Sequence, residues 1–186
     1  MEAEWEIEIG GDAPVIDAHW PGLVDLRGEP ERARELPETH QLPALAEALM
    51  RLNAGNSPVW TSKCDVFVPD HFDPDELDAP IGVTLRVLAC YVDLLSRAEK
   101  QWNSVETAVS ACRRICDRLR SVALPSCRAD LVIRRAMLDG DVETCGVTAY
   151  FTGAGRDEQS AAITLAAALA ALADAAVSGA APERVS

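Results

Sequence analysis

The stretch ADLVIRRAMLDGDVETCGVTAYFT, residues 129–152, is the most informative part of this sequence for the topology of the fold. It contains two segments rich in β-branched and aromatic residues, 129–137 and 146–152, on either side of Asp139-Gly140-Asp141. An Asp-Gly pair between two such segments is typical of a hairpin turn. The sequence therefore predicts that the two segments pair as antiparallel strands.

Helical periodicity precedes and follows this hairpin. Apolar residues recur at every third or fourth position from Trp102 to Leu119, and Asn103 followed by Glu106 resembles a capping box. After the hairpin, Gly153-Ala154-Gly155 predicts a turn, and residues 157–178 predict a final helix that ends at Gly179. We therefore expect one helix on each side of the hairpin in the chain.

Residues 83–95 fit two templates. They form an unbroken apolar run, as in a strand buried on both faces, but Leu85, Leu88, Val92 and Leu95 also align on one side of a helix. The β-branched residues and the tyrosine in this run are more frequent in strands. The strand is the favoured interpretation, and the helix stays an alternative.

The N-terminal half contributes further elements. Residues 4–9 alternate glutamate with Trp5, Ile7 and Ile9, which predicts a half-buried strand with these three side chains on its buried side. Residues 58–68 alternate similarly, with Trp60, Cys64, Val66 and Val68 on one face. Residues 43–53 show helical spacing, and residues 70–77 resemble a single capped helical turn. Residues 11–42 are punctuated by prolines and show no sustained period, which predicts a long loop or a disordered arm.

These elements indicate the α+β class. We predict a two-layer sandwich with a mostly antiparallel sheet, helices packed on one face, and a ferredoxin-like β-α-β-β-α block in the C-terminal half. The strand at Trp5 or the strand at Trp60 would complete the sheet from the N-terminal side. One domain is expected over residues 1–178, with a flexible tail at 179–186.

The composition is that of an acidic globular protein. Among 186 residues, 30 Asp and Glu against 17 Lys and Arg give a formal net charge of −13, and 48% of the residues are hydrophobic, which excludes an intrinsically disordered chain. The first residues lack the basic and apolar regions of a secretory signal, and Asp174 interrupts the Ala-rich stretch 161–181. We expect a cytoplasmic protein that does not span a membrane.

Basic residues are concentrated between residues 97 and 135, whereas the segments on either side are acidic. Nucleic-acid binders usually combine a basic domain with interleaved aromatic residues, but no aromatic residue lies between Trp102 and Tyr150. Nucleic acid is therefore an unfavoured partner, and salt bridges to the acidic N-terminal half are the favoured role. The arginines concerned are Arg113, Arg114, Arg118, Arg120, Arg128, Arg134 and Arg135.

The cysteines and histidines form no recognisable metal motif. Cys112 and Cys116 are four residues apart and could share a metal with Cys127 or Cys145, but both fall on the apolar side of the predicted helix, which favours core thiols. All six cysteines are expected to be unpaired. The three histidines lie in loop-like segments beside acids, where solvated or capping roles are favoured. We predict no metal and no cofactor.

Two segments combine tryptophan with polar side chains, which is a composition that binding pockets use. The apolar character of residues 15–25 predicts that this part of the long loop docks on the sheet with Trp20 partly buried, next to strand 58–68. The alternative is that the loop merely covers a sheet edge. A nucleophilic Cys64 activated by Lys63 is a weaker hypothesis, because neighbouring side chains on a strand point to opposite faces. The candidate pocket residues are Asp17, His19, Trp20, Asp25, Trp60, Lys63 and Cys64.

No segment carries a motif specific for a reaction. The leading hypothesis is a non-catalytic module that binds a protein partner or self-associates as a homodimer, because the last helix has more apolar surface than one packed face requires. The rival hypothesis is a domain that binds a small-molecule ligand, or a small enzyme, with its pocket between the 15–25 loop and the 58–68 strand. A third hypothesis is an acidic mimic of nucleic acid, or an RNA binder using the arginines.

Overall fold

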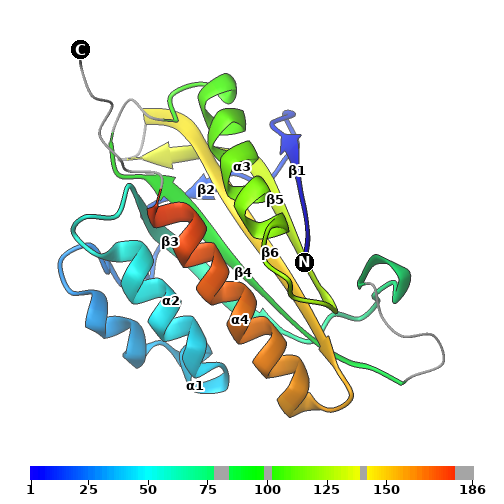
Figure 1. The fold of residues 1–186 in the computed structure, drawn as a ribbon. Helices are drawn as coiled ribbons and strands as arrows, with labels where there is room; N and C mark the ends of the chain where they lie inside the picture. The colour runs from blue at the N-terminus through cyan, green and yellow to red at the C-terminus, as the bar shows by residue number, and fades with distance from the viewer. Residues whose placement is uncertain (78–83, 99–101, 139–141, 179–186) are drawn as a thin grey trace.

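A mixed sheet forms one layer of the structure, and helices cover one of its faces (Figure 1). The computed structural model describes residues 1–77, 84–98, 102–138 and 142–178. The strands are β1 (Glu2–Glu8), β2 (Ile16–Asp17), β3 (Val59–Phe67), β4 (Arg86–Ser96), β5 (Cys127–Leu138) and β6 (Val142–Gly155). The α-helices are α1 (Pro37–Gln41), α2 (Pro43–Asn53), α3 (Val105–Arg120) and α4 (Glu158–Val177), and the 3-10 helices are η1 (Pro30–Glu35) and η2 (Asp75–Leu77). This is the predicted α+β sandwich.

The sheet contains the predicted ferredoxin-like block. Its strand order is β1-β5-β6-β4-β3, and β6 pairs antiparallel with both β4 and β5. Because β6 lies between β4 and β5, α3 crosses over it to connect the two, which is the split β-α-β arrangement. Both N-terminal strands join the sheet: β3 pairs antiparallel with β4, and β1 pairs parallel with β5. β2 continues the β1 edge by pairing parallel with Ala136 and Met137 of β5.

Strand β4 confirms the strand interpretation of the ambiguous apolar run. Cys90, Val92 and Leu94 face the helices and belong to the main core, whereas Leu95 packs on the opposite face with Trp60 and Ile16. Burial on both faces explains why the run lacks the alternation of a half-exposed strand. Val83, where the predicted run begins, lies outside the described residues, as do the 139–141 turn, Gly179 and the 179–186 tail.

The main core lies between the sheet and the helices. Its largest fully buried side chains include Phe151 from β6, Ile133 from β5, and Leu165, Leu169 and Leu172 from α4. Helix α4 is long and apolar enough to cross a membrane by length and composition alone, but here it contacts β6, α2 and α3. These neighbours bury Leu165, Leu169 and Leu172 completely, whereas Ile163 stays 63% exposed.

The glycines before α4 are part of β6 and not the predicted turn. A Cβ atom at Gly153 would lie 2.9 Å from the backbone nitrogen of Leu165, and one at Gly155 would lie 2.4 Å from that of Ala161. The absent side chains therefore let the α4 backbone approach β6 closely. Asp157 and Ser160 form a capping box at the start of α4.

Predictions about the faces of two strands need correction. In β1, Trp5 packs against the main core as predicted, but Ile7 is 45% exposed and Ile9, just beyond the strand, is 38% exposed, because β1 is an edge strand. In β3, the register shifts between Thr61 and Cys64. This irregularity breaks the alternation, so Trp60 packs on the open face of the sheet while Val66 belongs to the core under the helices.

Three predicted boundaries also differ. Residues 11–42 are not a plain loop, because they contain β2, η1 and α1, and Pro30 and Pro37 occupy first-turn positions of their helices. Helix α3 is capped one residue later than predicted, by Ser104 with Thr107. The helical turn expected at 70–77 is limited to η2.

Candidate functional site

Residues 15–25 dock on the sheet, as predicted, and Ser62 of β3 anchors them. The indole Nε1 of Trp20 donates a hydrogen bond of 3.3 Å to the Ser62 carbonyl oxygen. The Ser62 hydroxyl donates to the carbonyl oxygens of Asp17 and Ala18, at 3.0 and 3.3 Å. Trp20 is partly buried. The loop thus attaches to the edge strand of the sheet at two successive points.

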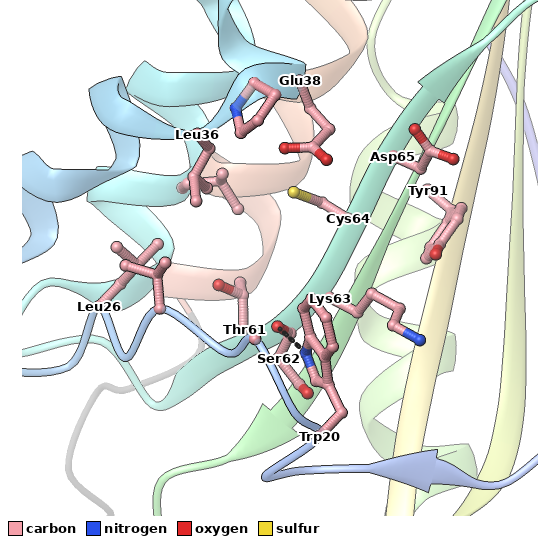
Figure 2. A pocket seen from close by; sticks show the side chains of 14 residues that line it. Trp20, Leu26, Leu36, Glu38, Thr61, Ser62, Lys63, Cys64, Asp65 and Tyr91 are labelled. Atoms are coloured by element: carbon pink, nitrogen blue, oxygen red, sulfur yellow. Dashed lines mark hydrogen bonds between the residues drawn. The ribbon is translucent and has the colours of Figure 1, made fainter.

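A cavity of about 440 Å³ remains between this segment, the start of α1 and strand β3 (Figure 2). Its size is within the range of small-molecule sites. One part of the wall is apolar and consists of Val24, Leu26, Leu36, Leu49 and the Trp20 ring. The other part is polar and consists of Glu38, Thr61, Ser62, Lys63, Cys64, Asp65 and Tyr91.

Three of the seven predicted pocket residues line this cavity, namely Trp20, Lys63 and Cys64. The other four do not. Asp17, His19 and Asp25 are exposed, and Trp60 is buried in the small cluster on the open face of the sheet. The structure therefore brings together the Trp20 end of the loop and the middle of β3, but it separates the acids and the histidine from them.

Two of these four residues, His19 and Asp25, form a second group around Trp60 together with Arg27. The guanidinium of Arg27 lies 4.3 Å from the centroid of the Trp60 ring, and the His19 ring centroid lies 6.1 Å from it. Asp25 accepts a bidentate pair of hydrogen bonds from Arg27. The Arg27 hydrogen bonds lower the pKa of the Asp25 carboxyl to about 2. The contacts of His19 and Arg27 with the Trp60 ring therefore hold this part of the chain against Trp60.

Cys64 is not an activated nucleophile. Burial raises the pKa of its thiol to about 12, and the charges of Glu38, Asp65 and Asp93 act in the same direction. In Figure 2 the sulfur points toward Leu36 and Glu38, whereas the Lys63 side chain extends away from it. The thiol therefore keeps its proton at neutral pH, and the hypothesis of activation by Lys63 is wrong.

Three charged groups on the cavity wall have no ion-pair partner within the described residues. They are the carboxylates of Glu38 and Asp65 and the ammonium group of Lys63. Asp65 Oδ1 accepts a hydrogen bond of 2.8 Å from the backbone of Val66, and Lys63 Nζ lies 5.0 Å from the centroid of the Trp20 ring. These groups retain hydrogen-bonding capacity for a ligand.

The open face of the sheet continues the polar wall of the cavity. Tyr91 of β4 and Tyr150 of β6 pair directly across the strands, with ring centroids 5.8 Å apart. In the next pair on the same face of the ladder, Thr148 donates to Asp93, which is only 7% exposed. Burial raises the pKa of the Asp93 carboxyl, against the opposing effect of the Thr148 hydrogen bond.

Arginines on the same face are paired with the acidic N-terminal strand. Arg134 forms an ion pair of 2.7 Å with Glu8 and donates to the Tyr150 hydroxyl at 3.1 Å. Arg128 pairs with Glu4 at 3.0 Å and with Asp130 at 2.9 Å. The role of these two arginines is the salt bridging predicted from the charge distribution.

The cysteines belong to the hydrophobic core. All six are unpaired, and Cys112 and Cys116 are buried between α3 and the sheet. Burial raises the pKa of Cys112 to about 12 and that of Cys116 to about 11. Across the described ranges, no group of three or more His, Cys, Asp or Glu side chains has the geometry of a metal site.

Sequence reasoning missed Glu38, Asp65 and Tyr91 on the cavity wall, and Asp93 behind them. Glu38 is one of many glutamates, and only the packing of α1 beside β3 brings it to Cys64. Tyr91 carried a weak signal, since the chain has only two tyrosines. An aspartate inside the apolar run 86–96 was the stronger signal, because a buried acid needs a specific environment.

Comparisons with protein-family models, with curated proteins and with solved structures find no match for this chain.

Proposed function

We propose that this chain is a small-molecule-binding domain whose ligand occupies the cavity between the 15–25 segment and β3. The observation that carries the proposal is the wall of this cavity, where Glu38, Lys63 and Asp65 have no ion-pair partner among the described residues. Such groups beside an apolar surface can orient a ligand while its apolar part is buried.

The anchoring of the loop supports the proposal. Trp20 and Ser62 hold the segment on β3 without filling the space between them and Leu36. A loop that only covered a sheet edge would pack against it. The proposal is limited to binding and does not use the Cys64 thiol as a nucleophile, because burial raises its pKa to about 12.

A thermal-shift screen with a library of small metabolites tests the proposal. A ligand at one hundred times its Kd stabilises a protein by about 2.7 kcal/mol, which corresponds to a rise of about 5–10 °C in the midpoint for a chain of this size. The rise should disappear in Trp20→Ala, Glu38→Gln and Asp65→Asn. It should persist in Glu31→Gln, an exposed substitution in η1 that changes the net charge equally.

Two results would contradict the proposal. One is a library in which no compound stabilises the wild type. The other is a stabilising compound whose effect is the same in all three cavity variants, since that compound binds elsewhere. Self-association and binding of a protein partner remain separate predictions, which light scattering tests independently of this screen.

A further inference from the structure

The two carboxylates of the cavity approach it from opposite sides of β3. Glu38 comes from α1 on the helix side, close to the Cys64 sulfur, and Asp65 lies on the open side next to Tyr91 (Figure 2). Neither carboxylate forms an ion pair with any residue that the structure describes. Both charges are therefore available to a group placed at the edge of β3.

The two carboxylates also affect the pKa values of two uncharged groups on the wall, the Tyr91 hydroxyl and the Cys64 thiol. Burial is the main cause that raises the pKa of Tyr91 to about 12, and Asp93 and Asp65 add to it. Burial is likewise the main cause for Cys64, and Glu38, Asp65 and Asp93 add to it. The carboxylates of Glu38 and Asp65 are therefore close enough to act on these two groups, and Lys63 is the positive charge on the same wall.

Asp93 is a buried carboxyl group behind Tyr91. Its side chain is 7% exposed, and Thr148 donates the one hydrogen bond that it accepts within the described ranges. The net charge of −13 adds a negative background to the carboxylates of Glu38 and Asp65. A negative potential in a partly enclosed site favours cations over anions.

The aromatic wall also suits a cation. Lys63 Nζ already lies 5.0 Å from the centroid of the Trp20 ring, a cation–π distance, and forms no carboxylate ion pair in the described structure. Lys63 is exposed and its side chain is long, so it can move away from the ring. A ligand cation that contacted Trp20 and the carboxylates together would have more favourable interactions there than Lys63 has.

We propose that the ligand of this cavity is a small organic cation, an amine or a quaternary ammonium compound, whose charge lies between Glu38 and Asp65. Its charged group also contacts the Trp20 ring, and its apolar part contacts Leu36. This inference rests on the function proposed above and specifies the ligand class of the same site. Lys63 acts as an internal competitor that occupies the Trp20 ring when the ligand is absent.

Isothermal titration calorimetry with matched probes tests the charge requirement. The probes are choline with its neutral isostere 3,3-dimethylbutan-1-ol, 5-aminopentan-1-ol with pentane-1,5-diol, agmatine, and glutarate as an anion. At least one cation should bind with a Kd below about 1 mM, and its neutral counterpart at least about tenfold more weakly, which is the magnitude of a desolvated cation–π contact. Binding should weaken in 1 M salt, where the Debye length is about 3 Å.

Variants of the wall separate a cation site from other sites. Glu38→Gln and Asp65→Asn should each weaken the binding of the cation by about fivefold or more, as expected for the loss of one charge pair. Lys63→Met keeps the volume of the side chain but removes its charge, so it should strengthen cation binding. Glu31→Gln, which lies outside the cavity, is the matched control and should leave the affinity within about twofold.

The outcomes distinguish this inference from the proposed function. If glutarate binds more tightly than the cations, if no cation of the panel binds, or if Lys63→Met weakens cation binding, the ligand class is wrong. The binding function then still stands, provided that another compound from the metabolite library loses its stabilising effect in Trp20→Ala. If the library also contains no such compound, both inferences are wrong.

Discussion

Thr148 Oγ1 donates a hydrogen bond of 2.6 Å to Asp93 Oδ1 across the adjacent strands β6 and β4. The bond lies on the face of the sheet opposite the helices, next to the Tyr91–Tyr150 pair. Arg134 from β5 and Lys63 from β3 are the positive charges that act on Asp93. Burial outweighs all three of these interactions, so the pKa of Asp93 is raised above its usual value of 3.8.

The first prediction follows from this raised pKa. The folded protein holds the Asp93 proton to a higher pH than the unfolded chain, so ionisation of Asp93 costs stability at neutral pH, and the cost disappears below pH 3.8. Asp93→Asn should therefore raise the urea midpoint at pH 7, and the gain should shrink as the pH falls toward 3.8. Asp12→Asn, an exposed control, should show neither effect. A lower midpoint for Asp93→Asn at pH 7 would contradict the prediction.

The second prediction concerns the buried Asn53 at the end of α2. Its Oδ1 accepts from the Thr61 backbone at 3.0 Å, and its Nδ2 donates to the Leu49 carbonyl at 2.9 Å. Asn53→Ala removes the acceptor of the buried Thr61 N–H group and the donor to the Leu49 carbonyl oxygen. The substitution should lower the free energy of unfolding by about 2–3 kcal/mol. Asn56→Ala, an exposed control in the following turn, should change it by less than about 0.5 kcal/mol. Urea denaturation measures the free energy of unfolding of both variants. Equal losses in the two variants would show that the hydrogen bonds of Asn53 do not stabilise the fold.

The third prediction concerns the close approach of α4 to β6. Gly153→Ala places a methyl group 2.9 Å from the Leu165 backbone nitrogen, and a backbone cannot move aside as a side chain can. We expect a loss of about 1–3 kcal/mol in the free energy of unfolding, as for other overpacked sites. Gly28→Ala meets no atom within 4 Å and serves as the control. A Gly153→Ala protein as stable as the wild type would contradict the packing argument.

The fourth prediction concerns thiol reactivity. All six cysteines are unpaired, and five of them are buried while Cys64 is half-buried. In the native protein, a thiol reagent should react slowly because burial raises the pKa of Cys64 to about 12 and that of Cys127 to about 12. The fastest phase should disappear in Cys64→Ala. In denaturant, without air oxidation, six thiols should titrate, and a smaller number would show that a disulfide forms.

The fifth prediction is self-association as a two-fold dimer. The packing of α4 against α2, α3 and β6 leaves a narrow strip exposed, in which Ile163 is 63% exposed and Ala167 and Ala170 lie beside it. A dimer formed through α4 has to use this strip. Light scattering should give twice 20.0 kDa at tens of micromolar for the wild type and 20.0 kDa for Ile163→Glu. A wild-type mass of 20.0 kDa would show that self-association is wrong.

Local patterns in the sequence were sufficient for α2, α3 and α4 and for most strands. The spacing of leucines after Pro43 predicts α2, and the apolar side from Val105 to Leu119 predicts most of α3. The turn residues between β5 and β6 predict their antiparallel pairing. These features could be predicted because helical periodicity, proline geometry and turn preferences depend on residues close together in the chain.

The sequence by itself thus determined the α+β class, the β-α-β-β-α block and the docking of Trp20 beside β3. Only the tertiary structure decided that the register shift after Thr61 places Trp60 on the open face, that β1 pairs parallel with β5, and that α1 brings Glu38 to Cys64. The physical reason is that strand register, edge pairing and the convergence of side chains depend on contacts between residues far apart in the chain. Their energies have no periodic signature along the sequence.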